Sequence, residues 1–244
     1  MNKDDNLSFS PWFARLRAVF EILLISGLIT SFLASLIMAA IFGRDRLGIL
    51  DTNANFLVAF LLLESAATFI LLWILMKTHR EALPDFGLRK MQWKTNVLLG
   101  LMLAPLLMLV NGAVGMVFHL FLPQYALERN PLTNTIQSPG QLALFILAAI
   151  IAGGIKEELQ RAFILRRFRH HLGGSAIGLI IWSLVFGVGH YVQGAQGIFV
   201  ATIYGFILGI FYLTRGSLIG PITAHAVYDT LALLLYWFSA DIQT

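Results

Sequence analysis

Two adjacent carboxylates and an arginine interrupt a strongly apolar stretch of the sequence. In "GGIKEELQRAFIL", Glu157 lies four residues and Glu158 three residues before Arg161, so on a helix either carboxylate can pair with the arginine. A salt-bridged trio that holds helices together is one explanation. However, an ionisable group at membrane depth costs at least about 2.5 kcal/mol and usually marks a functional site. Lys156, beside the pair, is expected to reach the membrane surface or to pair locally.

Two further segments place ionisable side chains in apolar surroundings. "FGVGH" sets Phe186 and His190 four residues apart, and "HAVYD" does the same for His225 and Asp229, so each pair shares a helix face. A single histidine in a membrane helix is more often a hydrogen-bonded packing residue than a ligand. Two of them, together with the carboxylate pair, favour a shared site. Glu64, in "LLLESAA", is expected to be a packing carboxyl or an auxiliary group of that site.

These residue types suit hydrolysis by activated water. A carboxylate from the first segment can accept a proton from water, while a neighbouring imidazole orients that water or shuttles the proton. A second imidazole can donate to the oxyanion that forms on an amide carbonyl, and an aspartate four residues on can fix the tautomer of that imidazole or accept a proton itself. Glu157, His190 and His225 could instead hold a divalent metal such as zinc. The chain has no cysteine, no His-Glu-x-x-His run and no Gly-x-Ser-x-Gly run, which leaves water as the nucleophile.

The elements that must position these groups are apolar blocks of about 20 residues, the length of a membrane-crossing helix. Of the 244 residues, 58% are hydrophobic and only 12% are charged, against about a quarter in soluble domains. Because backbone groups in lipid must be satisfied internally, each block is expected to be a helix. The sequence therefore predicts an all-α, polytopic membrane protein in a single domain over residues 1–244. About seven transmembrane helices, possibly eight, are expected at 18–42, 55–76, 96–122, 141–165, 175–192, 195–213 and 217–238.

The distribution of lysine and arginine predicts a cytoplasmic N-terminus. With that orientation the outer loops hold only Arg44, Arg46 and Arg129. The inner segments hold Lys3, Arg15, Arg17, Lys77, Arg80, Arg89, Lys90, Lys94, Arg166, Arg167, Arg169 and Arg215. This asymmetry follows the positive-inside rule and favours an inside N-terminus and an outside C-terminus. We expect a multi-pass protein of the plasma or inner membrane. The cations behind the net charge of +4 are therefore expected to orient the chain in the membrane and to contact anionic lipid headgroups. No nucleic-acid partner is expected.

Taken in order, "EELQR", "FGVGH" and "HAVYD" resemble the three motifs of the type II CAAX prenyl endopeptidase and bacteriocin-processing proteins, also called the Abi family. Those motifs read roughly Glu-Glu-x-x-x-Arg, Phe-x-x-x-His and His-x-x-x-Asn/Asp. The resemblance covers about residues 140–238, the expected catalytic-motif core. The first 90 residues match no pattern that we can name.

The resemblance implies an intramembrane endopeptidase acting on a membrane-associated or lipid-modified protein or peptide. Many members are labelled metalloproteases. By the same resemblance, the first-motif glutamate and His190 activate water, His225 and Asp229 stabilise the oxyanion, and Arg161 and Phe186 support them. The first motif here is one residue short, and alignment on the arginine would put a lysine at the glutamate position. Alignment on the acidic pair keeps Glu157 as the base, with Glu158 as the alternative.

Two other functions fit the same residues. A proton-coupled transporter also places glutamate, histidine and aspartate inside the membrane. A non-catalytic membrane protein of the bacteriocin-immunity type would keep the fold and bind a partner helix. The sequence leaves the substrate, its lipid modification and the need for metal open.

Overall fold

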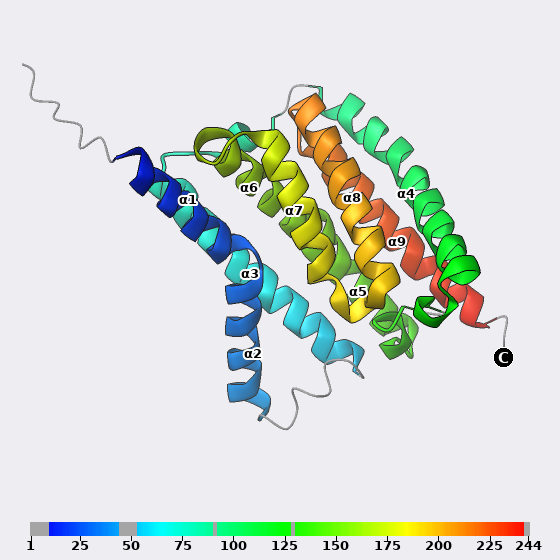
Figure 1. Cartoon of the computed structure of the whole chain (residues 1–244). Coiled ribbons are helices and arrows are strands. Elements are labelled where there is room, and N and C mark those ends of the chain that lie inside the picture. Colours follow the sequence, from blue (N-terminus) through cyan, green and yellow to red (C-terminus); the bar gives the residue numbers. More distant parts are fainter. Residues whose placement is uncertain (1–9, 44–52, 90–91, 128–129, 242–244) are drawn as a thin grey trace, which may run out of the picture.

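The computed structural model describes residues 10–43, 53–89, 92–127 and 130–241, and all regular structure in them is helical (Figure 1). The α-helices are α1 (Pro11–Ile25), α2 (Leu28–Phe42), α3 (Ala54–Thr78), α4 (Trp93–Phe121), α5 (Pro139–Ala149), α6 (Glu158–His171), α7 (Ser175–Gly189), α8 (Gly194–Arg215) and α9 (Ile219–Asp241). A π-helix, η5 (Ile150–Glu157), joins α5 to α6. Short 3-10 turns lie at Leu83–Phe86 (η2), Pro123–Tyr125 (η3), Thr133–Thr135 (η4) and Tyr191–Gln193 (η6).

These elements group into seven helical rods that coincide with the seven predicted blocks. The first rod is broken between α1 and α2, where Gly27 adopts φ 97°, a left-handed conformation that glycine reaches without steric cost. The fourth rod runs without a break from α5 through η5 into α6. The fifth is shorter than expected, because α7 ends at Gly189 and a 3-10 turn leads into α8. His190 therefore lies just past the helix, not within it.

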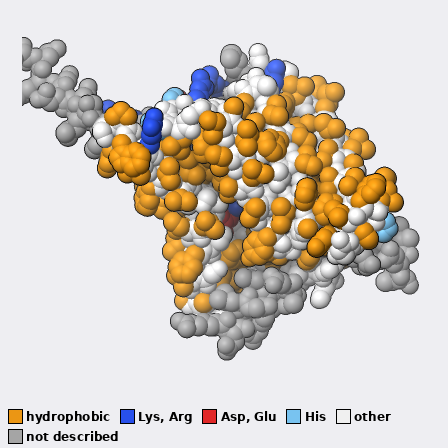
Figure 2. Space-filling model, viewed as in Figure 1, with side chains coloured by type: hydrophobic (Ala, Val, Ile, Leu, Met, Phe, Trp, Pro, Cys, Tyr) orange, Lys and Arg blue, Asp and Glu red, His pale blue; other side chains and the backbone are white. Residues whose placement is uncertain are grey.

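Four of the rods are long and apolar enough to cross a membrane: Pro11–Phe42, Ala54–Thr78, Trp93–Phe121 and Tyr191–Arg215. α7 is a shorter apolar helix. Large hydrophobic side chains are exposed along their outer surfaces, among them Leu109, Phe121 and Leu28, and Figure 2 shows such side chains over most of one face. These long apolar helices indicate a multi-pass membrane protein, because exposing so large an apolar surface to water would be unfavourable.

The interior of the bundle is built around α9, which packs against α4 and η5, while α7 packs against α8 and α6. The largest buried cluster joins Phe163 of α6 to Trp182 and Phe186 of α7. On the other side of α9, the Tyr204 hydroxyl of α8 donates to the Leu107 carbonyl of α4, at 2.6 Å. The helices that carry the predicted site residues are therefore fixed against one another on several sides.

One end of the bundle, which we call the cation-rich end, carries almost all the described lysines and arginines (Figure 2). It comprises Arg15, Arg17, Lys77, Arg80, Arg89, Lys94, Arg166, Arg167, Arg169 and Arg215. Arg167 is buried there and donates from Nε to Glu21 at 2.6 Å and from two other nitrogens to Glu81 at 2.8 Å. Burial alone would raise the pKa of Glu81, but hydrogen bonds and charge from Arg167 and Arg166 lower it.

Candidate active site

The π-helix η5 positions the two adjacent carboxylates. Glu157 is its last residue, and Glu158 is the first residue of α6. π-Helical turns are rare and frequently lie at functional sites. Gly153 and Gly154 let η5 approach α9 closely: a Cβ at Gly154 would lie 2.8 Å from the Cβ of Ala226, and one at Gly153 would collide with the Asp229 carboxylate. The two glycines therefore allow the first and third motifs to meet.

Glu158 is fully buried at the centre of a three-helix contact. One of its carboxylate oxygens accepts from Nδ1 of His225 on α9 at 2.8 Å, and the other accepts from Arg161. Arg161, also fully buried, lies over the Phe186 ring of α7, with 5.0 Å between its Cζ and the ring centroid. Arg161 thus pairs with Glu158, and the set links α6, α7 and α9.

Glu157 has a different environment from its neighbour. It lines a cavity, and its side chain keeps 18% of its exposure. Its Oε2 has no hydrogen-bond partner and lies 3.9 Å from Nε2 of His225. Its other oxygen lies 3.8 Å from Nζ of Lys156. Of the two sequence alternatives for the base, Glu157 lines the cavity, whereas Glu158 is fully buried and is not part of the lining.

His225 lies among three carboxylates. Its Nδ1 is bound to Glu158, while its Nε2 faces both Glu157 and Asp229, with 3.8 Å to Oδ2 of Asp229. Asp229 is one turn further along α9 and lines the same cavity. An imidazolium, which donates from both nitrogens, suits this surrounding of acceptors.

His190 reaches the same cavity from the end of α7. Its Nδ1 lies 2.8 Å from the Phe186 carbonyl oxygen, and its ring contacts the Phe186 ring at a centroid distance of 4.6 Å. Because a carbonyl oxygen can only accept, Nδ1 carries the proton, and in the neutral ring Nε2 has a free lone pair. The three predicted motifs therefore all reach one place.

The cavity has a volume of about 770 Å³. Its walls come from the first half of α3, from α4 and α5, from η5, from the α7–α8 turn at 189–193, and from α9. Glu157 and His225 are both among its lining residues. Its lining is a mixture of apolar side chains with neutral polar ones such as Asn111, Tyr228 and Gln193. A peptide segment and a water molecule both fit a space of this size and polarity.

A buried ion pair behind the site was not predicted. Nζ of Lys156 lies 2.7 Å from Oε2 of Glu64, and the other oxygen of Glu64 accepts from Thr30 and Thr68 at 2.9 and 3.2 Å. The sequence placed Glu64 as a packing or auxiliary carboxyl and left open a local partner or the membrane surface for Lys156. The sequence shows one acidic and one basic residue, Glu64 and Lys156, in separate apolar blocks, which is compatible with an ion pair. Their spacing in the sequence does not indicate that they are partners.

The side chains suggested by the sequence as metal ligands, Glu157, His190 and His225, do not form a metal site. In the described part of the chain no group of three His, Cys, Asp or Glu side chains is arranged to hold an ion. Two ligands of one tetrahedral zinc, each bound at 2.0–2.1 Å, lie about 3.4 Å apart. The Nε2 of His225 is farther than that from both carboxylates that face it, and its Nδ1 is engaged by Glu158.

Comparison with known proteins bears on the same segment. Residues 139–231 match the family model described as type II CAAX prenyl endopeptidase Rce1-like. Searches among curated proteins and among solved structures each found no match. The matched segment runs from the start of α5 into α9 and includes Glu157, Glu158, His190, His225 and Asp229. The predicted resemblance is thereby confirmed over residues 139–231, which are similar to the Rce1-like type II CAAX prenyl endopeptidases, a family that suggests an intramembrane protease.

Proposed function

We propose that this chain is an intramembrane endopeptidase that hydrolyses a peptide bond of a membrane-associated or lipid-modified protein. One observation carries the proposal: Glu157, His190, His225 and Asp229 line a single cavity, and one buried oxygen of Glu157 has no hydrogen-bond partner among the described residues. The family match over residues 139–231 supports the same reaction class. An acid–base pair beside a space for peptide and water is the minimum that amide hydrolysis requires.

The first step is attack by water. Glu157 takes one proton from a water molecule in the cavity. Nε2 of His190, free because Nδ1 donates to the Phe186 carbonyl, accepts a hydrogen bond from the remaining O–H and so orients the hydroxide. The hydroxide oxygen bonds to the amide carbon, and the carbonyl oxygen becomes an oxyanion. The Nε2–H of His225 donates to that oxyanion, and this hydrogen bond lowers the barrier because it strengthens as negative charge develops.

The second step releases the products. Glu157 returns its proton to the amide nitrogen, the carbon–nitrogen bond breaks, and the oxyanion collapses to a carboxyl group. One product carries a new carboxyl terminus and the other a new amino terminus, so the water atoms are accounted for. Asp229, whose Oδ2 lies 3.8 Å from Nε2 of His225 on α9, faces that nitrogen and stabilises the positive charge of the imidazolium.

Glu158, Arg161 and Phe186 act as positioning residues in this proposal. Glu158 holds Nδ1 of His225, and Arg161 neutralises Glu158 while it stacks on Phe186, whose backbone carbonyl holds His190. Both histidines are thereby oriented by one buried chain of contacts. A shift in any of these groups would move the general base and the oxyanion donor relative to each other.

The experiment is cleavage of a mixture of synthetic membrane-inserting peptides by purified protein in liposomes, with fragments identified by mass spectrometry. Wild type should produce internal fragments, and Glu157→Gln should reduce the rate at least 100-fold, the typical worth of a general base. Asp85→Asn, an exposed carboxylate at the cation-rich end, is the control and should keep the wild-type rate. Equal cleavage by Glu157→Gln, or proton-driven flux with no fragments, would contradict the proposal.

A further inference from the structure

The cavity is confined to one half of the bundle. Its lining includes the loop at 130–133, the α7–α8 turn at 189–193 and, from the last turns of α9, Tyr236 and Ser239. All of these lie at the end opposite the cation-rich end, near the end of α9 in Figure 1. No described lining residue comes from 79–95 or 161–178. Figure 2 shows an acidic side chain in a hollow in the middle of the apolar face, below the basic edge.

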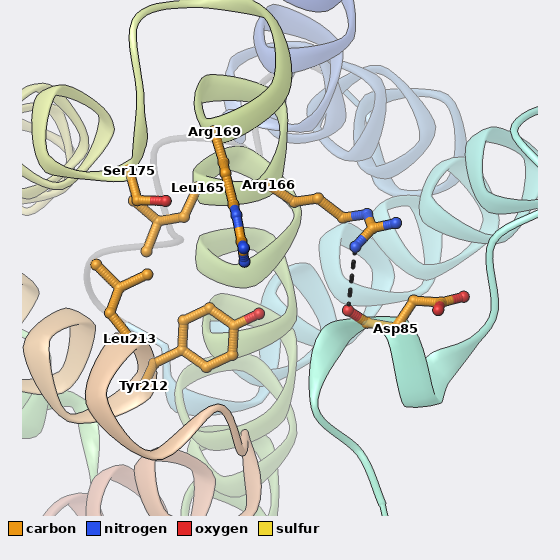
Figure 3. Close-up of a pocket in the computed structure, with 7 residues that line it drawn as sticks. All are labelled: Asp85, Leu165, Arg166, Arg169, Ser175, Tyr212 and Leu213. Carbon is orange, nitrogen blue, oxygen red and sulfur yellow. Dashed lines mark hydrogen bonds between the residues drawn. The ribbon is translucent and has the colours of Figure 1, made fainter.

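The cation-rich end has a separate and much smaller pocket. About 50 Å³ in volume, it lies between α6, α7, α8 and η2, and Arg166 and Arg169 extend beside Ser175 and Tyr212 in it (Figure 3). Nε of Arg166 donates to Glu81 at 2.7 Å, whereas Arg169 is exposed. The pocket has no histidine and no glutamate in its lining. Its arginines suit contact with anionic lipid headgroups, which are concentrated in the cytoplasmic leaflet.

Among the described residues, no lysine or arginine lies at the cavity end of the bundle. Cations in short loops orient membrane proteins with their cation-rich side in the cytoplasm. By that rule the cation-rich end faces the cytoplasm, so the mouth of the cavity, at the opposite end, faces away from the cytoplasm. We propose that the site takes its substrate from the extracytoplasmic side, as a peptide segment that has already crossed the membrane.

This inference rests on the proposed function and names the substrate class of that same site. The lining fits an internal segment: it has no described lysine or arginine that would hold a terminal carboxylate, and its ionisable groups are Glu157, Asp229, two histidines and two tyrosines in addition to Tyr228. Leu57, Phe60 and Leu233 supply apolar surface for side chains of the substrate. A secreted or membrane-anchored peptide that is cleaved within its extracytoplasmic portion would reach the cavity from the extracytoplasmic side and would present an internal segment to it.

The test uses single cysteines, for which this cysteine-free chain is a ready background. Ser239→Cys reports on the cavity mouth and Thr214→Cys on the cation-rich end. The two are matched: both hydroxyls are exposed near the end of a helix, and each donates to a carbonyl of its own helix at 2.9 Å. Each full-length variant is expressed in intact bacterial cells and treated with a membrane-impermeant maleimide before and after permeabilisation.

We expect labelling of Ser239→Cys in intact cells, with at least a tenfold lower yield for Thr214→Cys until the cells are permeabilised. The reverse pattern, or equal labelling of both variants in intact cells, would overturn the inference. Labelling requires no catalysis, so its result does not depend on whether peptide cleavage is observed. Conversely, cleavage in liposomes together with the reverse labelling pattern would leave the endopeptidase intact and refute its extracytoplasmic access alone.

Discussion

The contact between η5 and α9 gives the sharpest prediction about the geometry of the site. Gly153→Ala would place a methyl group against Oδ2 of Asp229 and 3.5 Å from Nε2 of His225. The carboxylate must move by about 1 Å to regain van der Waals separation. Because the atom it meets is the far end of a side chain, the fold can adjust, and we expect a stability loss near the lower end of the 1–3 kcal/mol typical of overpacking.

The expected effect on catalysis is larger than that on stability. A misplacement of about 1 Å in a catalytic group can reduce the rate about 100-fold. The matched control is Gly189→Ala, which lies on the wall of the same cavity but has no atom within 4 Å of the added Cβ. We therefore expect Gly153→Ala to cleave peptide about 100-fold more slowly than wild type, and Gly189→Ala to remain within a factor of about three.

The assay is the liposome cleavage reaction under single-turnover conditions, with thermal unfolding measured on the same preparations. A third variant, Gly154→Ala, meets the backbone of α9 and should mainly lose stability, because a helix moves less easily than a side chain. If Gly153→Ala cleaved peptide at the wild-type rate, the packing of η5 on Asp229 and His225 would not govern catalysis. That result would refute the reasoning.

Two further predictions concern buried charges. Arg161→Met leaves the Glu158 carboxylate buried with His225 as its remaining partner, so unfolding in detergent should become about 3–5 kcal/mol easier; a change below about 1 kcal/mol would contradict the assigned pairing. At the cation-rich end, Arg167 lowers the pKa of Glu81 from its ordinary value of 4.5, so the resulting stability is complete above that value and is lost as pH falls through the lower, folded pKa. The thermal midpoint of wild type should therefore fall more steeply than that of Glu81→Gln below about pH 4.5, and parallel pH profiles would refute this assignment.

The sequence predicts the helical rods well because hydrophobic length is a strong local signal. The block 55–76 became α3 at Ala54–Thr78, and 96–122 became α4 at Trp93–Phe121. The sequence also predicts a shared site for the three motifs, since ionisable groups in apolar surroundings need partners, and residues of all three line one cavity. The cytoplasmic N-terminus stays a prediction.

The directions of the adjacent glutamates could not be read from the sequence. An ideal α-helix would turn Glu157 and Glu158 about 100° apart, but the π-helix before them shifts the register of everything that follows. The ion-pair partners of Lys156 and Arg167 could not be predicted from the sequence either. Each pairs with a carboxylate on a rod far away in the chain, Glu64 for the first and Glu21 for the second. Only tertiary packing decides such pairs.

The central claim, that Glu157 gives and takes the proton in the cavity, can be tested by chemical rescue. Glu157→Ala opens space beside a cavity that a small carboxylate can enter, whereas Glu158 is fully buried and bound to Arg161 and His225. Added formate should restore part of the peptide cleavage lost in Glu157→Ala and none of that lost in Glu158→Ala. Rescue of Glu158→Ala alone, or no rescue of a folded Glu157→Ala protein, would contradict the account.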